Sequence, residues 1–257
     1  MTIDSRAVVD PSAKIANNVK IGPFSVIGAN VEIGEGTEIG PHVVINGPTR
    51  IGRENRIFQF SSIGEIPQDK KFHGEESRLE IGDRNTIREF VTINRGTADG
   101  GGVTRIGSDN WLMAYIHIAH DCLVGDHTIF ANGASIAGHV SIGNYSILGG
   151  FTLVHQFCAI GEHAFCGMGS AISKDVPPYV MVNGNPAHPH GLNTEGLKRH
   201  GFSKEALRIL REAYKTIYRS GMTLEEALIK LEVMSNSQPE VLPLTEFLRK
   251  AQRGILR

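Results

Sequence analysis

The chain has 257 residues, with 26 Lys or Arg against 27 Asp or Glu and a net charge of −1. This balance excludes a globally basic surface for nucleic acid, and no stretch resembles a signal peptide or a membrane span. We therefore expect neither nucleic acid nor stable membrane insertion. The length allows one elongated domain and a smaller one.

An apolar residue recurs at every sixth position through the first two thirds of the chain. The series begins at Ile3 and Val9, runs to Ile63, and returns between Ile81 and Ile172 after two interruptions. A period of six is typical of a parallel β-helix, in which short strands wind into a prism. Three such hexads form one coil of eighteen residues, and neighbouring coils lie about 4.8 Å apart.

A second pattern supports the first. A small or β-branched residue, such as Val19 or Ser25, stands two positions before most of the large apolar residues. Residues two apart in a strand point to the same face, so each hexad sends one large and one small side chain inward. The pattern predicts a β-helix over residues 1–190.

Two polar segments, near 65–80 and 94–104, interrupt the hexads, and the second is rich in glycine. Both are expected to be loops extruded from the prism. Loops on a rigid scaffold often carry function, although an extruded loop can equally be idle.

From about residue 194 the apolar spacing becomes helical, which predicts a helical unit over 191–257. Ser203 can cap a first helix, Thr223 with Glu226 forms a capping-box pattern before a second that ends near Ser235, and a third runs from Pro243 to about Arg253. Residues 190–257 hold twelve Lys or Arg against eight Asp or Glu, a net charge of +4. This favours an acidic partner; the alternative is a solvated helix surface.

The three cysteines, Cys122, Cys158 and Cys166, all fall on inward positions of the hexads. They are predicted to be buried core thiols, not ligands, nucleophiles or disulfides. Free thiols of this kind fit a reducing, cytoplasmic location.

The eighteen-residue coil brings chemically useful residues together. His120, Gly138 and Gln156 are spaced by eighteen and should stack in one column, with Asp121 and His139 in the next. Glycine between a histidine and a glutamine leaves a notch with an accessible backbone N–H. A base, room for two substrates and an oxyanion donor are what acyl transfer requires.

Other interpretations of this cluster remain open. His117 and His155 join His120 and His139 within about two coils, and a lone histidine on such a surface needs no function. The imidazoles of His117 and His120 on one strand and of His139 one coil away could instead hold a metal ion, although no pattern of supporting partners accompanies them. A non-enzymatic scaffold would not need histidines beside a notch. We expect no metal and no cofactor.

Several segments carry a family resemblance. They are HIAHDC (117–122), AGHV (137–140), VHQFC (154–158), KDVPPYV (174–180), GNPA (184–187) and NTEGLKRHGFS (193–203). Together with the helical C-terminus, they resemble the UDP-N-acetylglucosamine O-acyltransferase family of lipid A synthesis, essentially end to end.

The resemblance implies a left-handed β-helix and a homotrimer with active sites between neighbouring copies. It implies transfer of a (3R)-3-hydroxyacyl chain from acyl carrier protein to the 3-hydroxyl of UDP-N-acetylglucosamine, the first step of lipid A synthesis. A sister enzyme acylates a 2-amino group but normally carries an extra domain before the hexads. Acetyl-CoA-dependent hexapeptide enzymes generally lack the helical tail and the HQF segment.

The resemblance also assigns residues. His120 matches the general base, Asp121 the residue that orients it, and Gly138 the oxyanion donor. The positions that match substrate-lining residues of the family are His117, His139, His155, Gln156, Asn193, Glu195 and Arg199, together with Asp69 and Lys71 on the first extruded loop.

Three positions depart from the family pattern. Met168 stands where some members have glycine, on the acyl groove beside Gly150, and predicts a decanoyl-like rather than a myristoyl-like chain. Asn94 stands where the family usually has histidine, which bears on the sugar contacts and leaves a 3-amino acceptor open. His200 replaces the second arginine of a pair, which bears on one phosphate contact.

Overall fold

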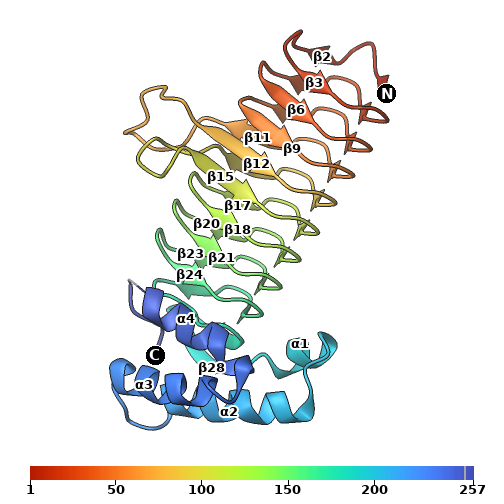
Figure 1. Ribbon diagram of the computed structural model, residues 1–257. Helices are drawn as coiled ribbons and strands as arrows, with labels where there is room; N and C mark the ends of the chain where they lie inside the picture. Colours follow the sequence, from red (N-terminus) through yellow and green to blue (C-terminus); the bar gives the residue numbers. More distant parts are fainter. Residues whose placement is uncertain (252) are drawn as a thin grey trace.

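The computed structural model describes residues 1–251 and 253–257 and shows a long prism of short strands with helices at its C-terminal end (Figure 1). Three sheets of eleven, nine and eight strands form the sides of the prism, and they are parallel except for the antiparallel pairing of the last two strands of the eleven-stranded sheet. Successive strands along the chain fall on the three sheets in turn as far as residue 172. The hexad prediction of a parallel β-helix is therefore confirmed.

The strands are short, and within each sheet they follow one another in chain order. The eleven-stranded sheet holds β1 (Thr2–Ile3), β4 (Lys20–Ile21), β7 (Glu38–Ile39), β10 (Arg56–Ile57), β13 (Thr86–Ile87), β16 (Trp111–Leu112), β19 (Ile129–Phe130), β22 (Ile147–Leu148), β25 (Phe165–Cys166), β27 (Val180–Asn183) and β28 (His188–Leu192). The nine-stranded sheet holds β2 (Val8–Val9), β5 (Val26–Ile27), β8 (Val44–Ile45), β11 (Ser62–Glu65), β14 (Thr92–Asn94), β17 (His117–Ile118), β20 (Ser135–Ile136), β23 (Leu153–Val154) and β26 (Ala171–Ile172). The eight-stranded sheet holds β3 (Lys14–Ile15), β6 (Val31–Ile33), β9 (Thr49–Ile51), β12 (Arg78–Ile81), β15 (Val103–Ile106), β18 (Leu123–Val124), β21 (Ser141–Ile142) and β24 (Ala159–Ile160).

Register follows the large apolar residues, which stack on one another from coil to coil, as Ile3 does on Ile21. Burial of this column is the main stabilising term, since apolar area removed from water contributes roughly 25 cal/mol per Å². Ile3 itself is 36% exposed, because no coil lies above it. The cysteines predicted to be core thiols are buried and free.

The prism has three edges, which we name by their contents. The histidine edge comprises the turns from the nine-stranded to the eight-stranded sheet, such as 119–122 and 137–140. The aromatic edge comprises the turns from the eleven-stranded to the nine-stranded sheet. There Phe24, His42, Phe60, Phe90 and Tyr115 stack in one ladder with ring centroids 4.8–5.4 Å apart. The helix edge comprises the remaining turns, where His163 packs against Phe202 of the C-terminal unit.

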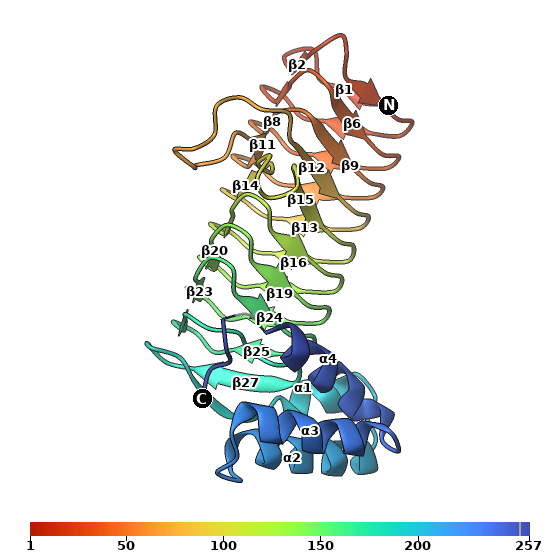
Figure 2. The same ribbon diagram turned by 60° about the vertical axis from the view of Figure 1, so that its left-hand side comes forward.

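Both interruptions of the hexads are loops, and both leave the histidine edge (Figures 1 and 2). They are shorter than expected. Glu65 still belongs to β11 and β12 begins at Arg78, so the first loop spans 66–77; the second spans 95–102. The strands beside the loops extend because polar residues there still pair, as Arg78 does with Val103. The hexad pattern missed this pairing because it follows apolar residues, whereas these strand ends carry polar side chains.

The C-terminal unit contains α1 (Thr194–Arg199), α2 (Lys204–Tyr218), α3 (Leu224–Ser235), the 3₁₀ turn η1 (Pro239–Val241) and α4 (Leu242–Lys250). Ser203 caps α2 and the capping box of α3 forms as predicted. The last helix ends at Lys250, earlier than expected, because Ala251 is extended; residue 252 lies outside the described residues. None of the helices in the described part of the chain combines the length and apolar character needed to cross a bilayer.

The tail of the chain returns to the prism. Ile255 pairs with Asp175, and Leu256 packs in the core of the prism, whereas Tyr179 packs in the helical core. Thus Leu256, which follows residue 190, packs in the core of the prism, and Tyr179, which precedes it, packs in the core of the helical unit. The division of the chain into two domains at residue 190 stays a proposal.

Candidate active site

The histidine edge carries the predicted column on three successive coils. His120 lies in the turn between β17 and β18, Gly138 between β20 and β21, and Gln156 between β23 and β24. Backbone bonds join these turns: the N–H of His139 donates to the carbonyl of His120 over 3.1 Å, and that of Phe157 to Gly138 over 3.1 Å. The predicted stacking is confirmed.

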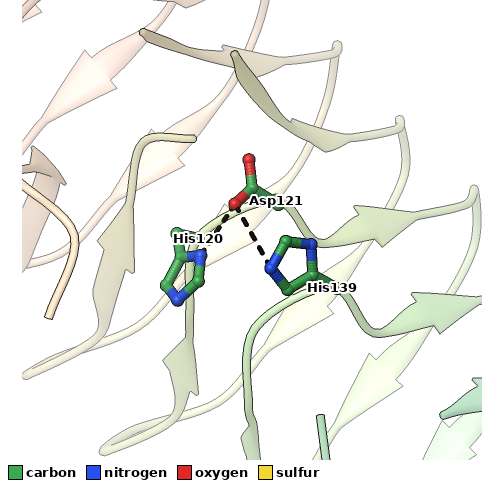
Figure 3. A group of neighbouring side chains, drawn as sticks. All are labelled: His120, Asp121 and His139. Carbon is green, nitrogen blue, oxygen red and sulfur yellow. Dashed lines mark hydrogen bonds and ion pairs between the residues drawn. The ribbon is translucent and has the colours of Figure 1, made fainter. Parts of the chain in front are cut away.

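His120 and Asp121 form a close pair (Figure 3). Nδ1 of His120 lies 2.7 Å from Oδ2 of Asp121, and the two side chains are 14% and 0% exposed. Burial alone would raise the pKa of Asp121, but hydrogen bonds from His120 and Thr97 outweigh it and the pKa is lowered. An ionised carboxylate can only accept, so Nδ1 donates to it and Nε2 of the neutral ring keeps its lone pair.

The carboxylate of Asp121 is held from the second extruded loop. Oδ1 accepts the backbone N–H of Thr97 over 2.8 Å, and Oδ2 accepts its hydroxyl over 2.7 Å. The backbone N–H of Asp121 in turn donates to the hydroxyl of Thr104 over 2.8 Å. The sequence analysis did not single out Thr97. The only feature that pointed to it was the Gly-rich interruption of the hexads in the coil before the histidine cluster.

Gly138 provides the predicted notch. A Cβ at this position would lie 2.6 Å from Cε1 and 2.7 Å from Nε2 of His120, so the imidazole occupies the space that any side chain would need. Within the described residues, no backbone or side-chain group accepts the Gly138 N–H. The notch thus places an imidazole beside a peptide N–H that has no acceptor among the described residues.

The other predicted histidines surround this pair. His139 stacks on Phe157 at 4.4 Å and its Nε2 lies 3.8 Å from Oδ2 of Asp121 (Figure 3). His117 shares a 2.7 Å hydrogen bond with the Thr92 hydroxyl, and burial lowers its pKa with a smaller contribution from His120, so the ring is neutral at pH 7. His155 and Gln156 are exposed on the next coil.

Four of the remaining predicted site residues do not reach this edge within one chain. Asn193, Glu195 and Arg199 begin the C-terminal unit beside the helix edge, where the Asn193 side chain caps α1 and donates to the carbonyl of His163 over 3.0 Å. Met168 lies on the aromatic edge beside Gly150 and is 77% exposed. The histidine column, Met168 and the Asn193–Arg199 segment therefore lie on three different edges.

Asp69 and Lys71 occupy a tight turn of the first loop, in which Asp69 Oδ1 accepts the Lys71 N–H over 3.0 Å. That loop is anchored from below by Asn94, which is 3% exposed and donates to the carbonyl of Ile66 over 3.0 Å. Within one chain, Asn94 is thus buried under the loop rather than presented to a ligand. His200 packs against the rings of Tyr145 and His163 on the helix edge.

The structure does not gather the three imidazoles of the metal alternative, His117, His120 and His139, but it brings Asp121 to two of them. Potential ligand atoms of His120, Asp121 and His139 lie within 4.8 Å of one another. However, the Asp121 oxygens already accept three hydrogen bonds, two from Thr97 and one from His120. A carboxylate that already accepts three hydrogen bonds, one of them from the imidazole, fits a hydrogen-bonded histidine–aspartate pair better than a metal ligand.

A left-handed parallel β-helix with a histidine–aspartate pair beside a glycine notch defines a hexapeptide-repeat acyltransferase. Comparison with known proteins agrees. Residues 12–47 and 104–138 match the family described as bacterial transferase hexapeptide (six repeats), and residues 175–256 match UDP-N-acetylglucosamine O-acyltransferase, domain 2.

Full-length relatives narrow the assignment. The acyl-[acyl-carrier-protein]–UDP-N-acetylglucosamine O-acyltransferase of Thiobacillus denitrificans is 62% identical over 100% of this chain and 99% of its own length. The solved structure of LpxA from Acinetobacter baumannii superposes with a TM-score of 0.98 at 51% identity, and that of Moraxella catarrhalis with 0.99 at 48%, each covering 100% of both chains. The chain belongs to the acyl-[acyl-carrier-protein]–UDP-N-acetylglucosamine O-acyltransferase family and is an acyltransferase.

Proposed function

We propose that this protein transfers a (3R)-3-hydroxyacyl chain from acyl carrier protein to the 3-hydroxyl of UDP-N-acetylglucosamine, as the first step of lipid A synthesis in the cytoplasm. The names of its relatives support the two substrates. The observation that carries the mechanism is the pair of His120 and Asp121, only 2.7 Å apart, beside the Gly138 notch.

The catalytic steps follow from this arrangement. Nε2 of His120 takes the hydroxyl proton while the sugar oxygen bonds to the thioester carbon, and the carbonyl electron pair moves to oxygen. The N–H of Gly138 stabilises that oxyanion, which contributes about 10²–10³-fold for one donor. Collapse breaks the C–S bond, and the imidazolium returns the proton to the thiolate of the carrier. General-base assistance contributes roughly 10²–10⁴-fold.

No covalent enzyme intermediate is required, because a thioester is already activated. The cysteine nearest the pair supports this view. Burial raises the pKa of Cys122 to about 12, and a thiol at neutral pH is a poor nucleophile. Direct transfer to the sugar is the simpler path.

Placement of the predicted binding residues on three edges supports a homotrimer. One chain cannot bring Met168 and Arg199 to His120, whereas neighbouring copies can present their other edges to it. The aromatic edge offers a contact surface, since Phe60 and Tyr115 are 50% and 63% exposed, and contiguous exposed apolar surface marks interaction sites. In the trimer, Asp69 and Lys71 and the Asn193–Arg199 segment complete the sugar-nucleotide site with His117, His139, His155 and Gln156.

Met168 is proposed to limit the acyl chain. It stands at the edge of the outward face of the nine-stranded sheet, beside Gly150, where a Cβ would meet Met168 Cγ at 3.9 Å. Leu153, which is 55% exposed, lies on the same outward face, along the path from the histidine edge toward Met168. A long side chain at the far end shortens the path and favours a decanoyl-like chain.

The helical unit is proposed to receive the acidic carrier protein. Several of its cations are neutralised locally by glutamates three residues away, including Lys198, Arg208 and Lys215. Exposed Lys204 and Arg211 are the stronger candidates, since no ion pair engages them within the described residues. Docking through these groups requires that the KM for the carrier-linked donor rise with salt.

The experiment is turnover of UDP-N-acetylglucosamine with a mixed pool of carrier-linked hydroxyacyl donors, read by mass spectrometry of the product. Substitution His120→Ala should lower turnover by at least about 10²-fold without changing the thermal midpoint or the trimer mass. His190→Ala, an exposed histidine on β28, is the matched control, and treatment with a chelator tests the metal alternative. Full turnover in the His120 variant would refute the mechanism. A monomer with full activity would refute the trimeric assembly.

A further inference from the structure

The second extruded loop, residues 95–102, contacts the catalytic pair in a way that its sequence did not suggest. Thr97 is 5% exposed and donates twice to Asp121, from its backbone N–H to Oδ1 over 2.8 Å and from its hydroxyl to Oδ2 over 2.7 Å. Two donors from one residue fix both the position and the rotation of a carboxylate. Hydrogen bonds to an ionised acceptor are about twice as strong as neutral ones.

The same loop closes over the carboxylate. The backbone N–H of Gly100 lies 3.2 Å from the Thr97 hydroxyl, and a Cβ on Gly100 would overlap the Asp121 carboxylate. The side chain of Asp121 is accordingly 0% exposed although it stands on an edge of the prism. Excluding water lowers the local dielectric and strengthens each bond within the cluster.

We propose that loop 95–102 is a positioning device for the catalytic pair: Thr97 holds Asp121 by both carboxylate oxygens, and Asp121 thereby fixes the ring of His120 over Gly138. The inference rests on the proposed role of His120. Thr97 bonds to the Asp121 carboxylate and not to the imidazole proposed to take the proton, so it is a positioning residue. Its effect reaches the reaction only through Asp121.

Two variants separate the hydroxyl from the shape of the side chain. Thr97→Val keeps the backbone donor and the volume but removes the hydroxyl, and it should lower kcat at least about tenfold, the loss expected for one hydrogen bond to a charged group. The KM for the sugar nucleotide should hardly change. Thr97→Ser keeps the hydroxyl and should recover most of the turnover, and Ala98→Ser, exposed on the same loop, is a neutral control.

The pH dependence provides a readout that a merely structural role would not move. The titratable groups facing Asp121 are His120, His139 and the thiol of Cys122. Bonds from Thr97 lower the pKa of Asp121, so their loss raises it. The acidic limb of kcat/KM should therefore move to higher pH in Thr97→Val but not in Thr97→Ser. Gly100→Ala should reproduce the shift by lifting the loop from the carboxylate.

A double variant tests the route of action. If Thr97 acts through Asp121, adding Thr97→Val to Asp121→Asn should cost little further turnover, since residues that share one network are not additive. Full additivity would overturn the inference. So would wild-type kcat and an unmoved acidic limb in Thr97→Val, provided that thermal unfolding and trimer mass show a folded protein.

Failure of the loop inference can be told apart from failure of the mechanism. If His120→Ala retains turnover, the proposed base is wrong, whatever the Thr97 variants do. If His120→Ala abolishes turnover while Thr97→Val and Gly100→Ala retain it, only the positioning role is wrong. A third measurement is the resonance of the His120 Nδ1–H group in proton–nitrogen-15 spectra. The inference requires that this resonance shift in Thr97→Val even without substrate.

Discussion

A single added methyl group on Gly138 should disable the proposed active site without unfolding the protein. Its carbon would lie 2.6 Å from Cε1 and 2.7 Å from Nε2 of His120, whereas ordinary carbon contacts are about 3.5–4.0 Å. The ring must therefore retreat by about 1 Å, and a misplacement of about 1 Å can cost about 10²-fold in rate. His120 cannot simply follow the methyl group, because Asp121 holds Nδ1 at 2.7 Å and is itself held by Thr97.

The assay is steady-state kinetics of Gly138→Ala with UDP-N-acetylglucosamine and a carrier-linked hydroxyacyl donor. We expect kcat to fall about 10²-fold, a loss of roughly 2.7 kcal/mol of transition-state stabilisation, with thermal unfolding little changed. Gly28→Ala is the matched control, because it adds the same methyl group to a turn distant from the site, where its nearest neighbour is the tip of the Asn46 side chain at 3.2 Å. Turnover close to that of the unmodified enzyme in Gly138→Ala would show that neither the imidazole position nor the notch matters, and the reasoning would be refuted.

Other expected outcomes follow from particular residues. Met168→Gly should move the donor preference toward longer hydroxyacyl chains, measured with donors of graded length; an unchanged preference would remove Met168 from the acyl path. Burial lowers the pKa of His163 to about 4, with a smaller contribution from His200. The unfolded chain therefore takes up this proton first, near its ordinary value of about 6.5. Stability conferred by the neutral ring is thus complete above that pH and is lost progressively as pH falls toward 4, so the thermal midpoint should decline over this window and decline less in His163→Phe. Cys122 should resist thiol reagents in the native protein and react only on unfolding, since it is buried and its pKa is raised to about 12; rapid labelling of the folded enzyme would contradict the buried core.

The sequence alone determined the prism. Large apolar residues such as Ile21 recur at every sixth position, and they can all point inward only if short strands turn at regular intervals. The hexads therefore dictate the coil length, the inward column and the burial of the three cysteines. The same arithmetic placed His120, Gly138 and Gln156 in one column, because in a solenoid the register converts sequence separation directly into distance.

Only the tertiary structure decided what the interruptions do. The lengths of the loops break the eighteen-residue arithmetic, so nothing in the spacing brings Thr97 to Asp121, and their meeting depends on how loop 95–102 folds back on the edge below it. Asn94 is buried beneath the first loop and His200 packs against Tyr145, and both are likewise long-range contacts. Local pattern fixes a repeating fold, whereas contacts between non-repeating segments depend on three-dimensional closure that no periodicity encodes.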